Sequence, residues 1–567
     1  MAAQDIIARD GPQIALTASA RAAGGGTLVP GPVRERFERT IDGSPPNDRA
    51  VADPARPRFS APFPPGYRAS GVLLHVTSLP SRYGVGDVGP SALAWVDRLA
   101  AAGQTWWQVL PLGPTGYGHS PYQALSSFAA NPLVISPDRL KEDGLLEPRD
   151  CEDCSFPSDH VDFERVIAFK ERLLACAWKN FRNGARADLR APFEQFCEEK
   201  AALQKEPALF MALRAKYRGS PFREWPTGLA RREPDALAKA RQESADAIDL
   251  FRFGQFTLAR HWQVLKEYAN QRGIRLLGDL PIFVSPDSSD VWANPELFLM
   301  DDQLKPRVVA GVPPDYFSAE GQLWGNPIYD WEALRQTGYR WWIDRLQARL
   351  PYLDAIRIDH FRGFEAAWHV PAGAPTAAAG HWVPGPGADF FDKAQQALGG
   401  LPLLAEDLGI ITPAVTALRD RFQLPGMRVL QFAFNGDPTN PHLPHHCVHN
   451  SVVYTGTHDN DTTRGWYDTL PEHERRHLWN ALQRPPGEPH EVTWELIRLA
   501  WSSLSALAVV PLQDLLGLGS AARMNLPGRA EGQWRWRCPD DALNDAVWQR
   551  LHELTRTSGR LPGGYHP

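Results

Sequence analysis

Short apolar segments alternate with longer helical stretches along the chain from about residue 71 onward. Each apolar segment ends in polar or glycine residues, a pattern that is typical of repeated β–α units. Eight segments have the length and composition of buried strands: Val72–His75, Trp107–Leu110, Arg275–Leu280, Ala355–Asp359, Leu403–Glu406, Arg428–Phe434, Val452–Thr455 and Ala508–Leu512. Because eight parallel strands can close on themselves, the pattern predicts an α/β fold, a (β/α)8 barrel of the TIM type over residues 67–567.

A long insertion separates the second and third predicted strands. Residues 137–255 contain helical stretches such as Phe163–Phe181, in which apolar side chains recur at spacings of three and four residues. We interpret this region as an inserted helical subdomain of the barrel. Residues 1–66 differ from the rest, because they are rich in Ala, Gly, Pro and Arg and offer little apolar surface to bury. They are predicted to form a flexible extension, with a small docking arm as the alternative.

A second insertion is predicted at residues 297–335. It includes Pro313-Pro314, which stiffens the backbone just before the aromatic residues Tyr316 and Phe317. The segment is either a loop that presents aromatic rings over a cleft or an ordinary proline-rich surface loop. The residues alone leave these two interpretations about even.

Composition and charge exclude several classes of protein. Hydrophobic residues make up 43% and charged residues 22%, as in ordinary globular proteins, and the net charge of −6 is too acidic for a nucleic-acid binder. No run of 18 or more apolar residues is present, and the N-terminal sequence lacks the pattern of a signal peptide, so no membrane association is expected. Six scattered cysteines suit a reducing compartment, which predicts a cytoplasmic protein.

Acidic residues stand at or just after the ends of four predicted strands. They are Asp279, Asp359, Glu406 and Asp459. In a barrel the carboxyl ends of all strands meet on one face, so four carboxylates far apart in sequence would share one pocket. Each could instead cap a following helix. Four independent caps explain the pattern less well than one acidic site does.

Two of these acids have surroundings that predict different protonation states. Arg357 and Asp359 are two residues apart on one strand, so they face the same way, and the guanidinium would lower the carboxylate pKa. An ionised Asp359 suits a nucleophile. Glu406 would need the opposite tuning to act as a proton donor. A pair of carboxyl groups about 5–5.5 Å apart would define a retaining double displacement.

Many ordered motifs carry a resemblance to a known family. They include Leu74-His-Val-Thr-Ser-Leu-Pro80, Trp107-Gln-Val-Leu-Pro-Leu-Gly-Pro-Thr-Gly-Tyr-Gly118, Ser120-Pro-Tyr-Gln123, Gly278-Asp-Leu-Pro-Ile-Phe-Val284, Gly311-Val-Pro-Pro-Asp-Tyr-Phe-Ser318, Trp324-Gly-Asn-Pro327, Arg357-Ile-Asp-His-Phe-Arg-Gly-Phe364, Ala405-Glu-Asp-Leu-Gly409, Gly456-Thr-His-Asp-Asn-Asp-Thr462 and Arg523-Met-Asn525. The chain thereby resembles the amylomaltases, the 4-α-glucanotransferases of the α-amylase clan, over roughly residues 68–537. The family transfers α-1,4-glucan segments between sugar chains.

The resemblance implies a role for individual residues. Asp359 matches the family nucleophile, Glu406 the general acid/base, and Asp459 a third carboxylate that grips sugar hydroxyls. Further substrate contacts are implied for Tyr122, Asp279, Arg357, His360, His458, Tyr316, Phe317 and Trp324. With the resemblance in hand, the loop that carries Tyr316 and Phe317 is expected to cover the cleft.

The resemblance also implies the reaction partners. They are maltooligosaccharides, α-1,4-glucans derived from starch or glycogen, and glucose, with neither a cofactor nor a metal. An α-amylase-like retaining hydrolase, which passes the intermediate to water, is the main alternative. A glucan-binding protein that has lost its chemistry is disfavoured, because all three catalytic carboxylates are present. Donor length, acceptor preference and oligomeric state are not determined by the sequence.

Overall fold

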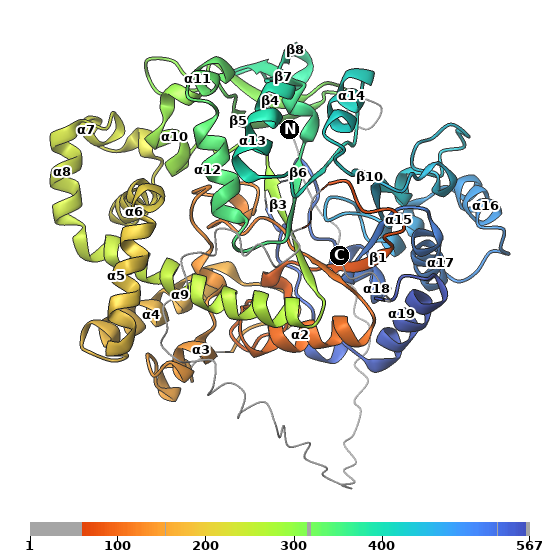
Figure 1. Cartoon of the computed structure of the whole chain (residues 1–567), viewed down its shortest axis with the longest axis horizontal. Helices are drawn as coiled ribbons and strands as arrows, with labels where there is room; N and C mark the ends of the chain where they lie inside the picture. The colour runs from red at the N-terminus through yellow and green to blue at the C-terminus, as the bar shows by residue number, and fades with distance from the viewer. Residues whose placement is uncertain (1–58, 60, 153–154, 315–318, 530, 563–567) are drawn as a thin grey trace, which may run out of the picture. The chain divides into compact units, whose positions relative to one another are not determined.

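The computed structural model describes residues 59, 61–152, 155–314, 319–529 and 531–562. Its centre is a sheet of eight parallel strands (Figure 1). In sheet order these strands are β10 (Gly426–Val429), β11 (Ser451–Tyr454), β12 (Leu507–Pro511), β1 (Ala69–Leu73), β2 (Trp106–Gln108), β3 (Arg275–Pro281), β6 (Ala355–Asp359) and β9 (Leu403–Ala405). All eight strands match segments predicted from the apolar pattern, and the predicted barrel is confirmed.

Hydrogen bonds join the two ends of this sheet into a barrel. The first and last strands along the chain are neighbours, with Ala69 opposite Leu507. On the other side, the amide of Ala405 in β9 donates to the carbonyl of Pro425, the residue before β10, at 2.9 Å. One predicted strand was too long, since β10 ends at Val429. The chain then turns through a 3-10 helix, η11 (Leu430–Phe432), which directs Gln431 toward the loop after β11.

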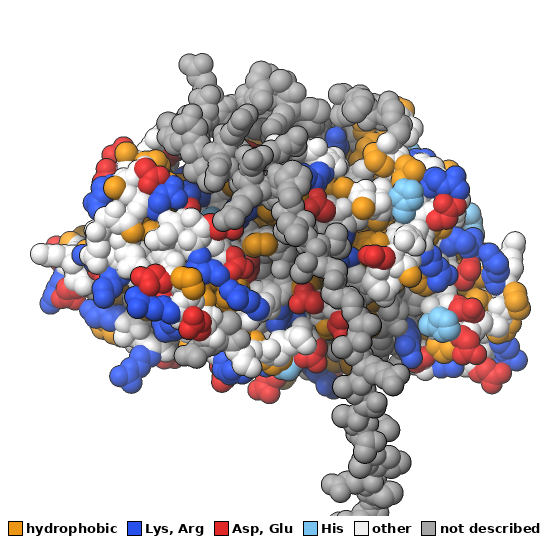
Figure 2. Space-filling view, turned by 90° about the horizontal axis from the view of Figure 1, so that it is seen from below, with side chains coloured by type: hydrophobic (Ala, Val, Ile, Leu, Met, Phe, Trp, Pro, Cys, Tyr) orange, Lys and Arg blue, Asp and Glu red, His pale blue; other side chains and the backbone are white. Residues whose placement is uncertain are grey.

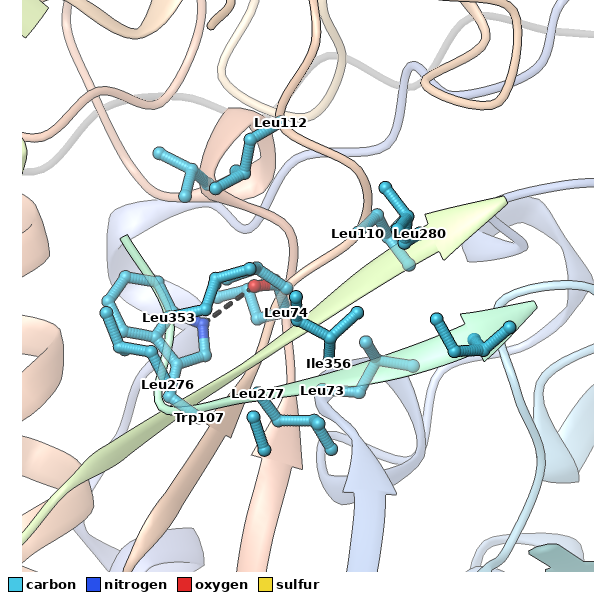
Figure 3. Close-up of a cluster of buried hydrophobic side chains, with 14 of the residues drawn as sticks. Leu73, Leu74, Trp107, Leu110, Leu112, Leu276, Leu277, Leu280, Leu353 and Ile356 are labelled. Atoms are coloured by element: carbon cyan, nitrogen blue, oxygen red, sulfur yellow. Dashed lines mark hydrogen bonds between the residues drawn. The ribbon is translucent and has the colours of Figure 1, made fainter. Parts of the chain in front are cut away.

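Large apolar side chains pack on the barrel strands. Trp107 is fully buried, and its indole nitrogen donates to the carbonyl of Leu74 at 2.8 Å (Figure 3). The same buried cluster includes leucine and isoleucine residues of β1, β3 and β6: Leu73, Leu276, Leu277 and Ile356 (Figure 3). Gly278 is required beside this cluster, because a Cβ atom there would lie 2.1 Å from Leu353 Cδ1. The packed interior fixes the strands whose ends carry the polar site.

Helices form the insertion between β2 and β3. They are α3 (Pro137–Glu142), α4 (Phe163–Arg182), α5 (Arg190–Glu199), α6 (Ala201–Lys216), α7 (Thr227–Ala230), α8 (Pro234–Glu243) and α9 (Ala245–Gln271). The predicted helix at Phe163–Phe181 is confirmed as α4, which buries the apolar face that its periodicity defines. Helix α9 continues past the predicted end of the insertion at residue 255 and leads directly into β3.

The remaining helices of the barrel follow its strands. Before the insertion stands α2 (Pro90–Ala101), and between β3 and β9 lie α10 (Ser289–Ala293), α11 (Trp331–Gln336), α12 (Arg340–Arg349) and α13 (Ala388–Leu398). After β9 come α14 (Pro413–Arg421), α15 (Thr463–Thr469), α16 (Glu472–Ala481), α17 (Pro489–Ser502), α18 (Leu512–Leu515) and α19 (Asp545–Thr557). The alternation of strands and helices is therefore that of a (β/α)8 barrel.

A second, antiparallel sheet was not predicted from the sequence. It has the order β5 (Gln322–Pro327), β4 (Val308–Val312), β7 (Ala366–Pro371) and β8 (His381–Pro384). The segment 297–335, predicted as a loop insertion, thus contributes two strands. The sheet is connected to the segment that follows β3, because the side-chain Nδ2 of Asn326 donates to the carbonyl of Val284 at 2.8 Å.

The last residues of the segment 1–66, which is predicted to be a flexible extension, include buried aromatic side chains. Residues 1–58 and 60 lie outside the described residues, but Phe59 and Phe63 are buried. Phe59 packs edge-on against Trp106 of β2 with ring centroids 5.9 Å apart, and the amide of Phe63 donates to Asn450. These aromatic anchors explain why the chain is fixed before β1 begins.

Near the other end of the described chain, Arg560 connects several segments at the amino ends of β1 and β12. Its side chain has no exposed surface, and its guanidinium donates to the carbonyls of Ala69, Trp501, Ser503 and Ser505 at 2.7–3.1 Å. A single buried cation therefore binds the residue that starts β1 and the turn that leads into β12.

Charged side chains of both signs are interspersed on the face of the molecule shown in Figure 2. Among the described residues, no helix combines the length and the apolar character that crossing a bilayer requires.

Candidate active site

The carboxyl ends of the barrel strands carry the predicted polar residues. Asp279 lies in β3, Arg357 and Asp359 lie in β6, and Glu406 directly follows β9. Asp459 follows β11 in the segment that begins after Tyr454. Hydrogen bonds and close electrostatic interactions connect these groups, so residues distant in sequence form one site, as predicted.

Arg357 is the centre of this site. Its Nη2 donates to Asp279 Oδ2 at 2.7 Å and to Asp359 Oδ1 at 2.8 Å, while its Nε donates to Asp279 Oδ2 at 2.9 Å. The arginine side chain is 4% exposed. A buried guanidinium held by two carboxylates has little freedom to move, so it fixes the orientation of the Asp359 carboxylate.

Asp279 is buried within the site, and its implied role as a sugar contact stays a prediction. Its side chain has no exposed surface, and the hydroxyl of Tyr122 donates to its Oδ2 at 2.7 Å. The carboxylate is thus enclosed by Arg357 and Tyr122. In this arrangement Asp279 orients those two side chains.

Burial raises the pKa of Asp359 to about 6. Arg357 acts in the opposite direction, as the sequence predicts, but the nearby carboxylates Asp279 and Asp459 add to the effect of burial. The net shift is therefore upward, opposite to the expected lowering. At neutral pH Asp359 is still mainly ionised, and its side chain is 27% exposed, which leaves it accessible from the cleft.

Glu406 has a higher pKa than Asp359. Burial and the charge of Asp359 raise the pKa of Glu406 to about 8, although Arg357 and two backbone hydrogen bonds lower it. These bonds come from the amides of His360 at 2.7 Å and Leu408 at 2.8 Å, and they fix both carboxyl oxygens. Glu406 is thus mainly protonated at neutral pH. One ionised and one protonated carboxyl side by side is the combination needed for a nucleophile and an acid.

The third carboxylate, Asp459, is held from two sides. Asn525 donates to its Oδ1 at 2.6 Å, and His458 Nε2 lies 3.3 Å from its Oδ2. Burial raises the pKa of Asp459, but His458 and the Asn525 hydrogen bond outweigh burial and hold that pKa well below its usual range. The Asp459 side chain remains 46% exposed, so an ionised oxygen is available to a ligand.

Aromatic rings line the site on either side of the carboxylates. The rings of Tyr122 and His458 stack with centroids 5.1 Å apart and an interplanar angle of 11°. Trp324 of β5 contacts His360 edge-on, with ring centroids 4.7 Å apart. Burial lowers the pKa of His360 to about 3, so its imidazole is neutral at pH 7. Flat apolar faces beside ionised oxygens suit a ligand with both C–H and hydroxyl surfaces.

Tyr316 and Phe317 are predicted to contact the substrate, whereas the contacts that Asn525 and Trp534 make were not predicted. Tyr316 and Phe317 lie outside the described residues, so their role stays a prediction. Asn525 belongs to a motif that carries the resemblance, yet its link to Asp459 was not predicted. Trp534 packs against both Tyr122 and His458, and no sequence signal pointed to it.

A small cavity opens behind His458, between the carboxyl ends of β1 and β12. His75, Ser78 and Asp514 contribute polar atoms to its wall. Burial, together with the proximity of His458, lowers the pKa of His75 to about 3, so its ring is neutral at pH 7. Among the described residues, no three His, Cys, Asp or Glu side chains are grouped closely enough to hold a metal ion.

Known proteins are similar to this chain in sequence and fold over most of its length. Residues 74–543 match the family model of 4-alpha-glucanotransferases. The 4-alpha-glucanotransferase of Synechocystis sp. is 50% identical over 497 residues, covering 87% of this chain and 98% of that protein. The Thermus thermophilus 4-alpha-glucanotransferase is 48% identical over 502 residues, covering 87% of this chain and 99% of that protein.

A solved structure supports the same assignment. The amylomaltase from Streptococcus agalactiae in complex with acarbose superimposes with a TM-score of 0.84 and 37% identity. It covers 87% of this chain and 99% of that structure's chain. The family match, the relatives and the shared fold agree, and this chain belongs to the 4-α-glucanotransferase family.

Proposed function

We propose that this enzyme transfers α-1,4-glucan segments to glucose or to another glucan by a retaining double displacement. The observation that carries the proposal is the pair of carboxyl groups at the ends of the neighbouring strands β6 and β9. Burial raises the pKa of Asp359 to about 6 and that of Glu406 to about 8, so an ionised and a protonated carboxyl coexist at neutral pH.

In the first step the glucan donor loses its reducing-end portion. A carboxylate oxygen of Asp359 attacks the anomeric carbon as the bond to the glycosidic oxygen breaks, and Glu406 gives its proton to that departing oxygen. The products are a glycosyl ester on Asp359 and a shortened glucan or glucose. Arg357, which donates to Asp359 Oδ1, holds the attacking carboxylate in position.

In the second step the ester is resolved by a sugar hydroxyl. Glu406, now ionised, removes the proton of a 4-hydroxyl group, whose oxygen attacks the anomeric carbon and displaces Asp359. Two inversions restore the α configuration, and both carboxyl groups return to their starting protonation states. Transfer exceeds hydrolysis when acceptor sugars occupy the site and exclude water.

Neighbouring groups supply the binding of the sugar at the reacting carbon. The exposed edge of Asp459 and the ring of His458 would hold hydroxyl groups, and Tyr122, which stacks on His458, would offer a flat face; the 46% exposure of Asp459 supports this. Trp324 and His360, whose rings contact each other edge-on next to Glu406, would extend this surface. The Streptococcus agalactiae relative was solved with acarbose, which supports a site for oligosaccharides here.

Incubation with maltotriose tests the proposed function. We expect glucose and a ladder of longer maltooligosaccharides, with the total concentration of reducing ends nearly constant, because each transfer breaks one glycosidic bond and forms another. Product sizes and reducing ends are followed together. Steadily rising reducing ends with only short products would instead identify a hydrolase.

The pH dependence of kcat/KM should be bell-shaped with a maximum near neutral pH. As the pH falls through about 6, Asp359 gains a proton and can no longer attack. As the pH rises through about 8, Glu406 loses the proton that the leaving oxygen needs. Initial rates of glucose release from maltotriose, measured between about pH 4 and about pH 10 in buffers of constant ionic strength, check this. A rate that stays flat on the alkaline side would contradict the assignment of Glu406.

A further inference from the structure

The chain after the last barrel strand returns to the catalytic site and contacts the loop that carries Asp459. Asn525 Nδ2 donates to Asp459 Oδ1 at 2.6 Å, and its backbone amide donates to the carbonyl of His458 at 3.1 Å. Arg523 Nη2 donates to the backbone carbonyl of Asp459 at 2.7 Å, and its Nε donates to the carbonyl of Asn525 at 2.6 Å. Three of these hydrogen bonds join the two segments, and the fourth, between Arg523 and Asn525, stiffens the segment that donates them.

Trp534 adds an aromatic contact to the same loop. Its ring lies 5.9 Å from that of His458 and 5.6 Å from that of Tyr122, with interplanar angles of 39° and 40°. The tryptophan is 6% exposed, so it supports both rings from behind. It therefore restrains two residues that the proposed mechanism uses to bind the sugar.

We propose that Arg523, Asn525 and Trp534, here called the clamp, are positioning residues for the proposed transfer reaction. The clamp sets the plane of the Asp459 carboxylate and the tilt of the His458 and Tyr122 rings. None of its members needs to touch the reacting atoms. The inference rests on the proposed function, in which Asp459 binds the sugar.

The backbone at Trp534 shows that its position is strongly determined by the surrounding structure. Its φ is +65°, in the left-handed region, where a bulky side chain is disfavoured. The amide of Trp534 donates to the carbonyl of Met524 at 2.8 Å, which ties it back to the clamp's other members. This hydrogen bond and the ring contacts with Tyr122 and His458 hold the strained conformation in place.

Hydrogen bonds beyond Trp534 anchor the clamp to a rigid part of the barrel. The carbonyl of Arg535 accepts from Val161 at 2.7 Å, and the carbonyl of Trp536 accepts from the hydroxyl of Ser78 at 2.7 Å. Arg537 is 1% exposed and donates to the carbonyl of Pro157 at 2.7 Å. These bonds join the segment after β1 and the start of the helical insertion, so the clamp has a fixed base.

Asp459 is the group through which the clamp acts. His458 lies next to it on the same loop. Arg357 and Asp359 of β6 and Tyr122 of the loop after β2 also interact with it electrostatically. The Asn525 amide is one of the donors that favour its ionised form. Loss of this donor should therefore alter both the geometry of Asp459 and the pH at which it accepts a proton.

The variants Asn525→Asp and Asn525→Ala test the clamp. Asn525→Asp keeps the shape but sets one carboxylate against another, and we expect kcat/KM for maltotriose to fall roughly 100-fold, mostly through kcat. The acid limb of its pH profile, which Asp359 sets, should move upward, because another negative charge at this site adds to the carboxylates that already raise the pKa of Asp359. Asn525→Ala, which adds no charge, should lose activity with a smaller displacement of the limb. The matched control is Asn544→Asp, since Asn544 caps α19 and aspartate caps equally well.

Trp534 provides a second, independent series. Trp534→Ala should reduce kcat/KM by about tenfold to 100-fold, whereas Trp534→Phe, which keeps an aromatic face, should recover most of that loss. Melting temperatures and circular dichroism identify any variant that fails to fold. The clamp proposal is then judged on the variants that do fold. Folded Asn525 variants within threefold of wild type, with an unmoved acid limb, would overturn the proposal. Equal losses for Trp534→Ala and Trp534→Phe would also overturn it.

Assays of the wild-type enzyme distinguish a failure of the proposed function from a failure of the clamp proposal. If wild type produces no maltooligosaccharide ladder, the proposed function fails whatever the variants do. If wild type transfers normally while folded clamp variants match it in kcat, KM and pH profile, only the clamp fails.

Discussion

Replacing Asp359 with Asn should abolish glucan transfer, with kcat on maltotriose falling by about 10⁴-fold or more. The amide cannot form the glycosyl ester, and no neighbouring carboxylate can take its place. Asp279 is enclosed by Arg357 and Tyr122, and Asp459 is held by Asn525. Product ladders and reducing ends over long incubations measure the residual rate.

The control for this variant is Asp392→Asn, which removes an exposed carboxylate paired with Arg421 and should leave transfer unchanged. The melting temperature of Asp359→Asn should stay close to that of wild type, because the lost Arg357 contact is offset by reduced repulsion among the acids. Transfer by a folded Asp359→Asn protein at more than a trace rate would contradict the assignment of the nucleophile.

Replacing Glu406 with Gln should produce a loss that depends on the leaving group. On maltotriose we expect kcat to fall by about 10²–10⁴-fold, because the departing oxygen receives no proton. A glycosyl fluoride needs no protonation, so the first step should proceed and release about one equivalent of fluoride per enzyme before turnover stalls. A fluoride electrode and intact-protein mass spectrometry would detect the burst and the glycosylated protein.

Two comparisons make this result specific. Asp359→Asn should show no fluoride burst, and Glu553→Gln, which changes an exposed carboxylate paired with Arg556, should behave as wild type. Loss of the alkaline limb of the pH profile should accompany Glu406→Gln. Equal losses on maltotriose and on the fluoride would contradict the role of Glu406 as the acid.

The barrel and the acidic residues could be predicted because each strand carries its own local signal. A fully buried parallel strand appears as a short apolar run, and Asp279 and Asp359 end two such runs. The geometry of parallel strands then brings their ends together without further information. The end of β10 was misjudged because Leu430 and Phe432 continue the apolar run after the backbone has turned.

The small sheet and the clamp could not be predicted because they depend on contacts between distant segments. Strands β4 and β7 are short and pair Gly311 with Trp368, so neither has a periodic pattern that identifies it alone. Asn525 and Trp534 contact partners in loops more than 60 residues away along the chain. The rise in the Asp359 pKa likewise depends on how deeply folding buries it.

The pairing of β1 with β12 has a consequence for synthesis on the ribosome. The strand that starts the barrel at Ala69 finds its second neighbour only when Leu507 has been made, and Arg560 joins both strands later still. Until then a growing chain exposes an open edge on β1, of the kind that attracts other unfolded chains. Ring closure is therefore one of the last events in folding, and a ribosome-bound chain stalled before residue 507 should depend on chaperones to stay unaggregated.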